Sequence, residues 1–263
     1  MNPWTEWPDA PVVLSYGGGV NSTALLVGLW EKHGRLPDLV LFADTGGEFP
    51  ETYAYVEVMR EWCEARGCTL EIVTNADPGG ERHGHKSLED ECHRNVGLPS
   101  LAFGFAGCSS KWKRHPIHRR IKKLGAPVVH QLIGIDAEER HRSANLEDGS
   151  GRNIYYRPLV DWDWGRDECL EAIERAGLPT CGKSACWFCP AAKKHEVLAL
   201  AKDRPELFAR AVAMERNAKP RLTATKGLGR GFSWEELVAG DRAQLKLFPE
   251  PPDADCGCYD GEE

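Results

Sequence analysis

Short apolar runs alternate with amphipathic stretches along the first two thirds of the chain. Apolar residues dominate positions 12–16, 39–43, 69–74 and 128–135, which predicts buried strands. Apolar residues at helical spacing predict helices over residues 21–33, 50–66, 115–124, 163–176 and 191–217. This alternation is typical of an α/β fold with a mostly parallel sheet and helices on both faces. Ligands bind such sheets beyond the carboxyl ends of the strands.

The chain is expected to fall into two regions. We expect an α/β nucleotide-binding domain over residues 1–160 and a helical, cysteine-rich region over residues 161–263 that completes the site. Residues 76–114 are expected to form a long functional excursion, and residues 141–157 a polar loop. No apolar run approaches the roughly 20 residues that cross a bilayer, and no export signal precedes the first strand. We therefore expect a cytoplasmic location and no membrane partner.

The first predicted strand runs into three glycines and then into a helical pattern. Bare backbone at a helix N-terminus binds anions, because unpaired N–H groups and the helix dipole both favour negative charge. The segment therefore predicts a phosphate site, most often that of a nucleotide. Its candidate nucleotide-binding residues are Ser15, Tyr16, Gly17, Gly18, Gly19, Asn21, Ser22 and Thr23.

Two other phosphate motifs compete with this interpretation. Residues 177–184 match the G-x-x-x-x-G-K-S pattern of a Walker A loop, but they follow a predicted helix and not a strand. Gly17 and Gly19 also fit the start of a Rossmann dinucleotide loop, with Asp44 at the distance of a ribose contact. In that motif, however, Ser22 stands in place of the third glycine.

Several segments in order resemble one known family. Residues 15–22, SYGGGVNS, resemble the S-G-G-x-D-S loop of the PP-loop (ATP pyrophosphatase, or adenine nucleotide alpha-hydrolase) superfamily. Residues 44–52, DTGGEFPET, resemble the D-T-G-x-x-F-P-E-T segment of the phosphoadenosine phosphosulfate (PAPS) reductase family. Similar segments follow at 108–116, 134–140, 158–164 and 186–190. The resemblance covers residues 12–190 and implies a HUP-like (Rossmann-like) sheet with a cysteine-bearing C-terminal helical extension.

The resemblance also implies an adenine-nucleotide site. Asp44 would position Mg²⁺ or the ribose of ATP, and Lys113 would neutralise phosphate or sulfate charge, so both are candidate catalytic residues. Asn21 stands where the PP-loop usually carries Asp, which puts a metal role for this position in doubt. Further nucleotide-binding candidates are Thr45, Gly46, Gly134 and Arg140.

The chain contains ten cysteines, which favour metal, cluster or redox chemistry over a disulfide scaffold in a protein that is not exported. Cys181, Cys186 and Cys189 place three thiols within nine residues, and soft thiolates select zinc or iron–sulfur clusters. The resemblance adds Cys108 as a further ligand. We expect these four cysteines to hold a [4Fe–4S] cluster. A structural zinc site with four cysteine ligands and a buried or redox pair are the alternatives.

Two segments concentrate positive charge, although the net charge of the chain is −7. Residues 111–123 contain seven Lys or Arg and two His, residues 216–230 contain five Lys or Arg, and neither contains an acid. These segments could hold a nucleotide's phosphates or follow an RNA or DNA backbone. The alternative is a solvated cationic surface.

Residues 255–259, DCGCY, resemble the E-C-G-L-H tail of sulfonucleotide reductases, whose cysteine attacks sulfur. Cys256 is therefore a candidate catalytic nucleophile. Our main expectation is an enzyme that cleaves ATP and transfers sulfur to an adenylylated acceptor, for which a nucleic acid is one candidate, with a sulfur or electron donor protein. The alternatives are a PAPS or APS reductase that uses Cys256, and a non-catalytic nucleotide-binding partner subunit, which Asn21 suggests.

Overall fold

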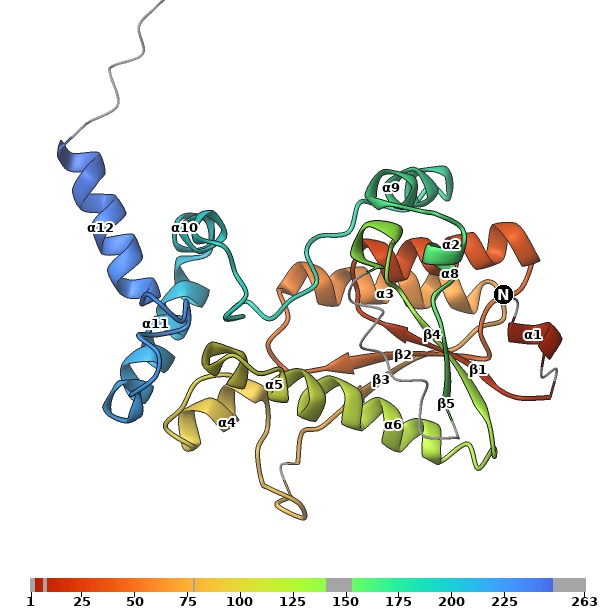
Figure 1. Cartoon of the computed structure of the whole chain (residues 1–263), viewed down its shortest axis with the longest axis horizontal. Coiled ribbons are helices and arrows are strands. Elements are labelled where there is room, and N and C mark those ends of the chain that lie inside the picture. Colours follow the sequence, from red (N-terminus) through yellow and green to blue (C-terminus); the bar gives the residue numbers. More distant parts are fainter. Residues whose placement is uncertain (1–2, 7–8, 78, 141–152, 248–263) are drawn as a thin grey trace, which may run out of the picture.

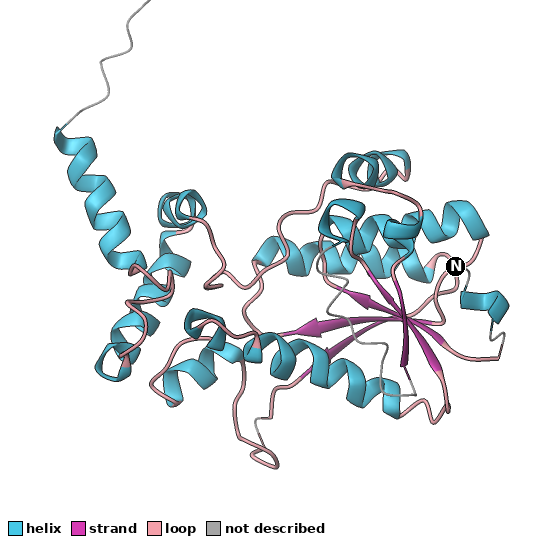
Figure 2. Ribbon diagram, in the orientation of Figure 1, coloured by secondary structure: helices cyan, strands magenta, loops and turns pink. Residues whose placement is uncertain are grey.

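The computed structural model describes residues 3–6, 9–77, 79–140 and 153–247. Its centre is a parallel sheet of five strands in the order β3-β2-β1-β4-β5 (Figures 1 and 2). The strands are β1 (Val12–Tyr16), β2 (Leu39–Asp44), β3 (Leu70–Thr74), β4 (Val129–Ile133) and β5 (Asn153–Tyr156). The predicted α/β fold with a parallel sheet is thereby confirmed.

Helices cover both faces of the sheet, as the near-continuous apolar strands indicate. On one face Leu14 of β1 belongs to a core with helices α2 (Val20–His33), α3 (Pro50–Glu64) and α9 (Arg166–Arg175). On the other face Val13 belongs to a core with Ile117 of helix α6 (His115–Lys122). Neighbouring residues of a strand point to opposite faces, so one apolar strand serves both cores.

A third core lies beside the sheet and joins two distant parts of the chain. Trp112 and Cys92, from the excursion at 76–114, share it with Trp187, Met214 and Trp234. The helices of this region are α4 (Leu88–Arg94), α5 (Gly107–Ser109), α10 (Lys194–Asp203), α11 (Pro205–Ala218) and α12 (Trp234–Leu247). Figure 1 shows these helices at the side of the sheet where β2 ends.

The remaining elements of the described chain are short. They are α1 (Pro3–Glu6), α8 (Pro158–Asp161), the 3-10 turns η1 (Ser100–Phe103), η3 (Ala137–Glu139) and η4 (Lys219–Arg221), and the π-helical turn η2 (Ser110–Arg114). Among the described helices, none is both long and apolar enough to cross a membrane.

The main differences from the predicted elements lie in the second half of the chain. β5 falls inside the predicted polar loop at 141–157, and the helix predicted at 191–217 is two helices. These two helices meet at Arg204, whose φ of −139° and ψ of 61° are not helical. Pro205 follows, and a proline disfavours helical geometry in the residue before it.

Candidate functional site

The glycine loop joins the end of β1 to the start of α2. Gly18 has a φ of +78°, a conformation that side chains with a Cβ rarely adopt. The hydroxyl of Ser22 accepts a hydrogen bond from the Gly17 amide at 3.2 Å and donates to the Gly19 carbonyl at 3.1 Å. A Cβ added to Gly134, just after β4, would lie 2.8 Å from the Ser22 nitrogen. The loop is therefore held in a fixed shape at the carboxyl ends of β1 and β4.

Other residues assigned to this loop point away from it. The Tyr16 ring is buried, and its hydroxyl lies 3.0 Å from the Thr23 hydroxyl within the core under α2. Burial raises the pKa of Tyr16 well above its ordinary value. Ser15 accepts a hydrogen bond from the Gln131 amide at 2.7 Å. The side chains of these three predicted residues therefore support the loop from beneath and do not line its outer side.

The turn after β2 lies next to the glycine loop. The Asp44 carboxylate accepts hydrogen bonds from the Gly46 amide and the Tyr53 hydroxyl, both at 2.7 Å. Burial, followed by the bond to Asp44, raises the pKa of Tyr53, which keeps this phenol a donor. Thr45 is buried, and its hydroxyl accepts from the Gly47 amide at 3.2 Å. The turn holds Asp44 at the strand end where sequence analysis placed it.

The cysteine loop, defined here as residues 181–190, closes over both of these segments. The Ser184 hydroxyl donates a hydrogen bond to the Gly17 carbonyl. Trp187 donates its amide to the Gly47 carbonyl at 2.9 Å, and Glu48 and Cys186 form an antiparallel bridge. The segment that matches the Walker A pattern therefore packs against the glycine loop through Ser184 and does not form a separate phosphate-binding loop.

A buried ion pair lies beneath Cys186. The side chain of Glu48 is fully buried, and its Oε1 lies 2.8 Å from Nζ of Lys113. Cys186 Sγ lies 4.0 Å from the same oxygen and 3.2 Å from the Thr45 hydroxyl. Burial, followed by the charge of Glu48, raises the pKa of Cys186 to about 12. Glu48 is a site residue that sequence analysis missed, because it occupies a variable position of the motif that begins at Asp44.

Lys113 stays charged in this environment. Burial, the largest single influence, would lower its pKa, but the charge and hydrogen bond of Glu48 together with the charges of Cys186 and Cys189 outweigh burial and raise it. The second carboxylate oxygen of Glu48, Oε2, is buried and has no hydrogen-bond partner among the described residues. A lysine that neutralises an internal carboxylate is not free to neutralise a phosphate. This contact changes the role expected for Lys113, from a phosphate ligand to a partner of Glu48.

Three of the four predicted ligand cysteines lie in one region of the structure. After burial, the nearby Cys108 thiol helps to raise the pKa of Cys189 and of Cys92 in α4, and Cys189 helps to raise the pKa of Cys186. Cys181 lies elsewhere, in the core under α2, next to Thr23 and Tyr55. Cys181 was expected from spacing along the chain, but its thiol is turned into a different core.

This arrangement does not fit the expected cluster. Within the described ranges, no three His, Cys, Asp or Glu side chains are grouped so that they could hold a metal ion. The ion pair of Glu48 and Lys113 also lies beside Cys186. We therefore derive no chemical step through a cluster or a zinc ion.

The loop after β4 faces the start of α2. Asn21 donates its side-chain amide to the Asp136 carboxylate at 2.9 Å and to Glu139 at 3.4 Å. The buried Asp136 also accepts the Glu139 amide at 2.9 Å, so it caps the turn that follows. An aspartate at position 21 would meet two carboxylates here. Arg140 is exposed and forms an ion pair with Asp163, which directs it away from the glycine loop.

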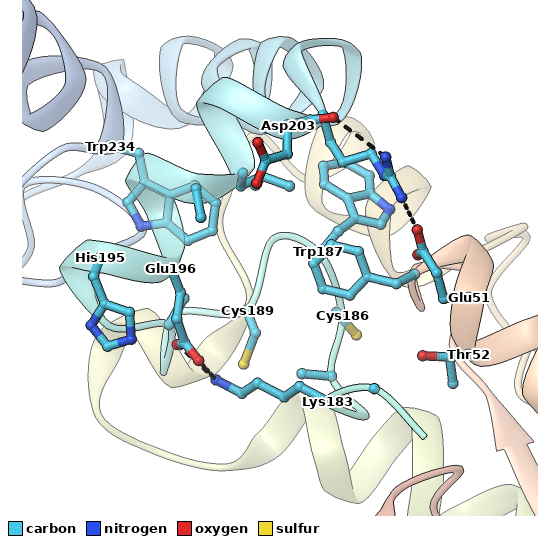
Figure 3. Close-up of a pocket in the computed structure, with 17 residues that line it drawn as sticks. Glu51, Thr52, Lys183, Cys186, Trp187, Cys189, His195, Glu196, Asp203 and Trp234 are labelled. Atoms are coloured by element: carbon cyan, nitrogen blue, oxygen red, sulfur yellow. Dashed lines mark hydrogen bonds and ion pairs between the residues drawn. The ribbon is translucent and has the colours of Figure 1, made fainter. Parts of the chain in front are cut away.

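A cavity of about 610 Å³ opens on the other side of the cysteine loop (Figure 3). Cys186 and Cys189 lie in its wall, between Trp234, His195 and Glu196 on one side and Trp187, Glu51 and Thr52 on the other. Lys183 pairs with Glu196 at 2.6 Å. Thr52 also approaches the glycine loop, because a Cβ added to Gly18 would lie 3.0 Å from its methyl group. Both thiols can thus be reached from this cavity.

Many basic residues of segment 111–123 have partners within the protein. Lys111 pairs with Glu91, Lys113 with Glu48, and Arg120 with Glu71 at 2.6 Å. Arg119 donates to the Asn75 side chain at 2.8 Å. In segment 216–230, Arg216 pairs with Glu235. The predicted catalytic residue Cys256 lies outside the described residues.

Two solved structures and one family model are similar to this chain. A crystal structure of PAPS reductase from Candida auris, a phosphate complex, is 22% identical over 70% of this chain and 85% of that chain, with a TM-score of 0.47. A U34-tRNA thiolase, NcsA from Methanococcus maripaludis with its [4Fe-4S] cluster, is 15% identical over 88% of this chain and 81% of that chain, with a TM-score of 0.44. No curated protein matches the chain. Residues 11–181 match the family "Phosphoadenosine phosphosulfate reductase domain", so the chain belongs to this family of enzymes.

Proposed function

We propose that the protein binds ATP with its phosphates against the glycine loop and handles sulfur at Cys186, in an adenylylation-coupled transfer to an acceptor. One observation carries this proposal. The cysteine loop bonds to the glycine loop through Ser184 and to the turn after β2 through the Thr45–Cys186 contact of 3.2 Å. In this proposal, the phosphate cradle and the sulfur of Cys186 share one wall. The proposed acceptor is a nucleic acid, for which the two basic segments are the supporting feature.

In the proposed chemistry, only cysteine thiols of the protein carry the sulfur. An acceptor oxygen attacks the α-phosphorus of ATP, and pyrophosphate leaves with the bonding pair. A donor that carries a persulfide transfers its outer sulfur to the Cys186 thiolate and leaves as a thiol. The terminal sulfur of the Cys186 persulfide then displaces AMP from the acceptor carbon and leaves a Cys186–acceptor disulfide. The Cys189 thiolate then attacks Cys186 Sγ, which releases the acceptor as a thiolate and forms a Cys186–Cys189 disulfide. An external dithiol reduces this disulfide and completes the cycle.

Magnesium would enter with ATP. Mg²⁺ needs only one or two protein carboxylates when phosphates supply its other ligands, and Asp44 is the carboxylate at the strand end beside the glycine loop. Bound there, the ion would neutralise the leaving pyrophosphate. Asn21 supplies an amide instead of a further carboxylate, and Asp136 and Glu139 are already tied to it.

Substitution of one glycine tests the nucleotide site. Gly18→Ala adds a Cβ 3.0 Å from Thr52 at a φ of +78°, directly in the proposed cradle. Gly34→Ala is the matched control, because its φ is +61° but no atom lies within 4 Å of its Cβ. We expect Gly18→Ala to weaken ATP binding at least tenfold by calorimetry at a temperature where circular dichroism shows both variants to be folded, and Gly34→Ala to bind ATP like the wild type. Equal ATP affinity in the two variants would contradict the site.

Two turnover assays separate the alternative functions. Pyrophosphate and AMP release from ATP, dependent on an acceptor, supports sulfur transfer. Sulfite release from PAPS that disappears in Cys256→Ala would instead support the reductase, which the family match and the Asp255–Tyr259 segment favour. Binding of ATP without either reaction would indicate a partner subunit.

A further inference from the structure

Two exposed phenylalanines stand on the segment that leads to Cys108. Phe103 ends η1 and is 41% exposed, and Phe105 is 60% exposed. The Phe105 ring packs over the backbone of Gly107, where an added Cβ would lie 3.0 Å from the ring. Ser100 accepts the Cys108 amide at 2.6 Å, which fixes the segment below the rings. Aromatic faces so exposed contribute nothing to the cores described above.

One basic segment packs against residues 95–101, and the other directly follows Cys108 in the chain, although about a hundred residues separate the two segments in the sequence. Arg221 donates to the Asn95 carbonyl at 3.1 Å, and Arg230 donates to the Leu101 carbonyl at 2.9 Å. From the other segment, Arg114 bonds to Ser110, five residues beyond Phe105. Figure 1 shows the turn after α11 beside α4 and α5. Positive charge therefore borders residues 95–110 on two sides.

Acidic residues do not cancel this charge. The first turn of α4 contains Glu89, Asp90 and Glu91, but each has a basic partner, respectively Arg210, Arg94 and Lys111. Within the described part of the chain, no carboxylate forms an ion pair with Arg114, Lys219, Arg221, Lys226 or Arg230. All five of these side chains belong to exposed residues. The local field favours a polyanion, in a chain whose net charge is −7.

We infer that this is a docking surface for single-stranded nucleic acid. We call it the stacking surface and define it by Phe103, Phe105, Arg114, Arg221 and Arg230. The arginines meet phosphates while unpaired bases stack on the phenylalanine rings, a combination typical of single-strand binding. A duplex hides its base faces, so the rings cannot use it in the same way. A path for the strand from these rings past Cys108 to Cys186 rests on the proposed function. Binding of the strand to the stacking surface does not depend on that function.

Fluorescence anisotropy with labelled 12-nucleotide strands tests the surface. The full chain is titrated with single-stranded RNA, single-stranded DNA of the same sequence, and the DNA duplex. We expect the single strands to bind at least tenfold more tightly than the duplex. The RNA and DNA arms identify which source of unpaired bases the protein prefers. Phe103→Ala with Phe105→Ala should weaken single-strand binding by about tenfold or more, because stacking is lost.

Charge variants provide an independent measurement. Arg221→Gln with Arg230→Gln should weaken binding and reduce the slope of log K against log salt by about 0.7 for each lost phosphate contact. Lys122→Gln is the matched control from the first basic segment, since Lys122 ends α6, at the far end of that segment from Arg114. Trp30→Ala is the control for an exposed aromatic ring, 37% exposed on α2. Neither control should change binding.

Two outcomes would overturn the surface. One is unchanged affinity in both the phenylalanine and the arginine variants. The other is a concentration-dependent dimer, seen by light scattering, that the phenylalanine variants dissociate, because the rings would then belong to a contact between two copies. Failure of ATP binding with intact strand binding would reject the proposed function alone. The reverse result would reject the stacking surface alone.

Discussion

At the scale of single residues, Glu48 has the largest influence on the candidate site. It is buried, it neutralises Lys113, and it lies next to Cys186. A buried carboxylate with one unpartnered oxygen is costly, so its retention here needs its lysine. The pair also sets the charge around the thiol, because Glu48 raises the pKa of Cys186 and Lys113 lowers it.

Opposite changes in thiol reactivity follow from this pair. Glu48→Gln removes a negative neighbour, which lowers the pKa of Cys186 and should speed its alkylation by iodoacetamide at pH 8 by about threefold to tenfold. Lys113→Gln removes the positive neighbour and should slow it. The rates are read at Cys186 by mass spectrometry on metal-free protein, with Lys122→Gln as control. Faster alkylation in both variants would mean that loosened packing, and not charge, sets the rate.

Asp77 predicts an acid-dependent contribution to stability. Its carboxylate accepts the amides of Arg82, His83 and Gly84, and these bonds hold its pKa well below the ordinary value. A lowered folded-state pKa stabilises the fold above the unfolded pKa of about 3.9, and this stabilisation is lost as the pH falls below that value.

Urea unfolding at pH 7 and pH 3 checks this expectation. Asp77→Asn should reduce the free energy of unfolding more at pH 7 than at pH 3, because at pH 3 the wild-type carboxyl has begun to lose its advantage. An equal reduction at both pH values would show that shape and not charge matters in this turn.

At the scale of elements, regular periodicity was predictable and tertiary contacts were not. β1, β2 and α2 were predicted because each has a strong apolar pattern and because glycines separate β1 from α2. β5 was missed because its residues Asn153–Tyr156 follow a polar stretch and pair only with β4 at one edge. The candidate site was predictable only in part for the same reason. The place of Asp44 could be predicted because this residue ends a predicted strand. The contact of Ser184 with Gly17 could not, because it joins positions 167 residues apart.

Glu215 organises the last described element. This buried carboxylate accepts the Leu228 amide at 2.6 Å, the Trp234 amide at 3.0 Å and the Ser233 hydroxyl at 2.9 Å. It therefore caps α12 from a neighbouring helix, in addition to Ser233, whose hydroxyl accepts the Glu236 amide at 3.4 Å. Nothing in the local sequence of α12 could have indicated Glu215 as a partner.

Removal of the Glu215 charge should loosen α12. Glu215→Gln places an amide donor against backbone donors, so we expect a loss of about 1–3 kcal/mol in the free energy of unfolding. Glu206→Gln, an exposed position on the same helix, should have little effect. Thermal unfolding followed by circular dichroism measures both. A loss shared equally by the two variants would contradict the capping role.

At the scale of the whole molecule, three cores meet around one site. Two of them cover the faces of the sheet and supply the glycine loop, and the third positions Cys92, Cys108 and Cys186. The cysteine loop belongs to both sides, since Cys181 is anchored in one core and Phe188 in another. A rearrangement of either part is therefore transmitted to the other through ten residues of chain.

Ser184 predicts a measurable effect on nucleotide affinity. Its hydroxyl bonds to Gly17, and its Cβ would lie 3.1 Å from a Cβ added to Gly19, so it stands over the proposed cradle. If phosphates must displace it, Ser184→Ala should tighten ATP binding by about fivefold, the equivalent of one hydrogen bond. Lys183→Gln is the neighbouring control. Calorimetry measures both variants, and weaker binding in Ser184→Ala would make this serine a ligand.

The same contact closes a thermodynamic cycle between the two halves of the site. When the cradle is available only while Ser184 is released, the observed dissociation constant is the intrinsic value divided by the released fraction. Anything that reshapes residues 181–190, such as a Cys186–Cys189 disulfide, would change that fraction. By reciprocity, bound nucleotide would change how readily the thiols of Cys186 and Cys189 react. The affinity for nucleotide and the reactivity of these thiols would then report the same equilibrium.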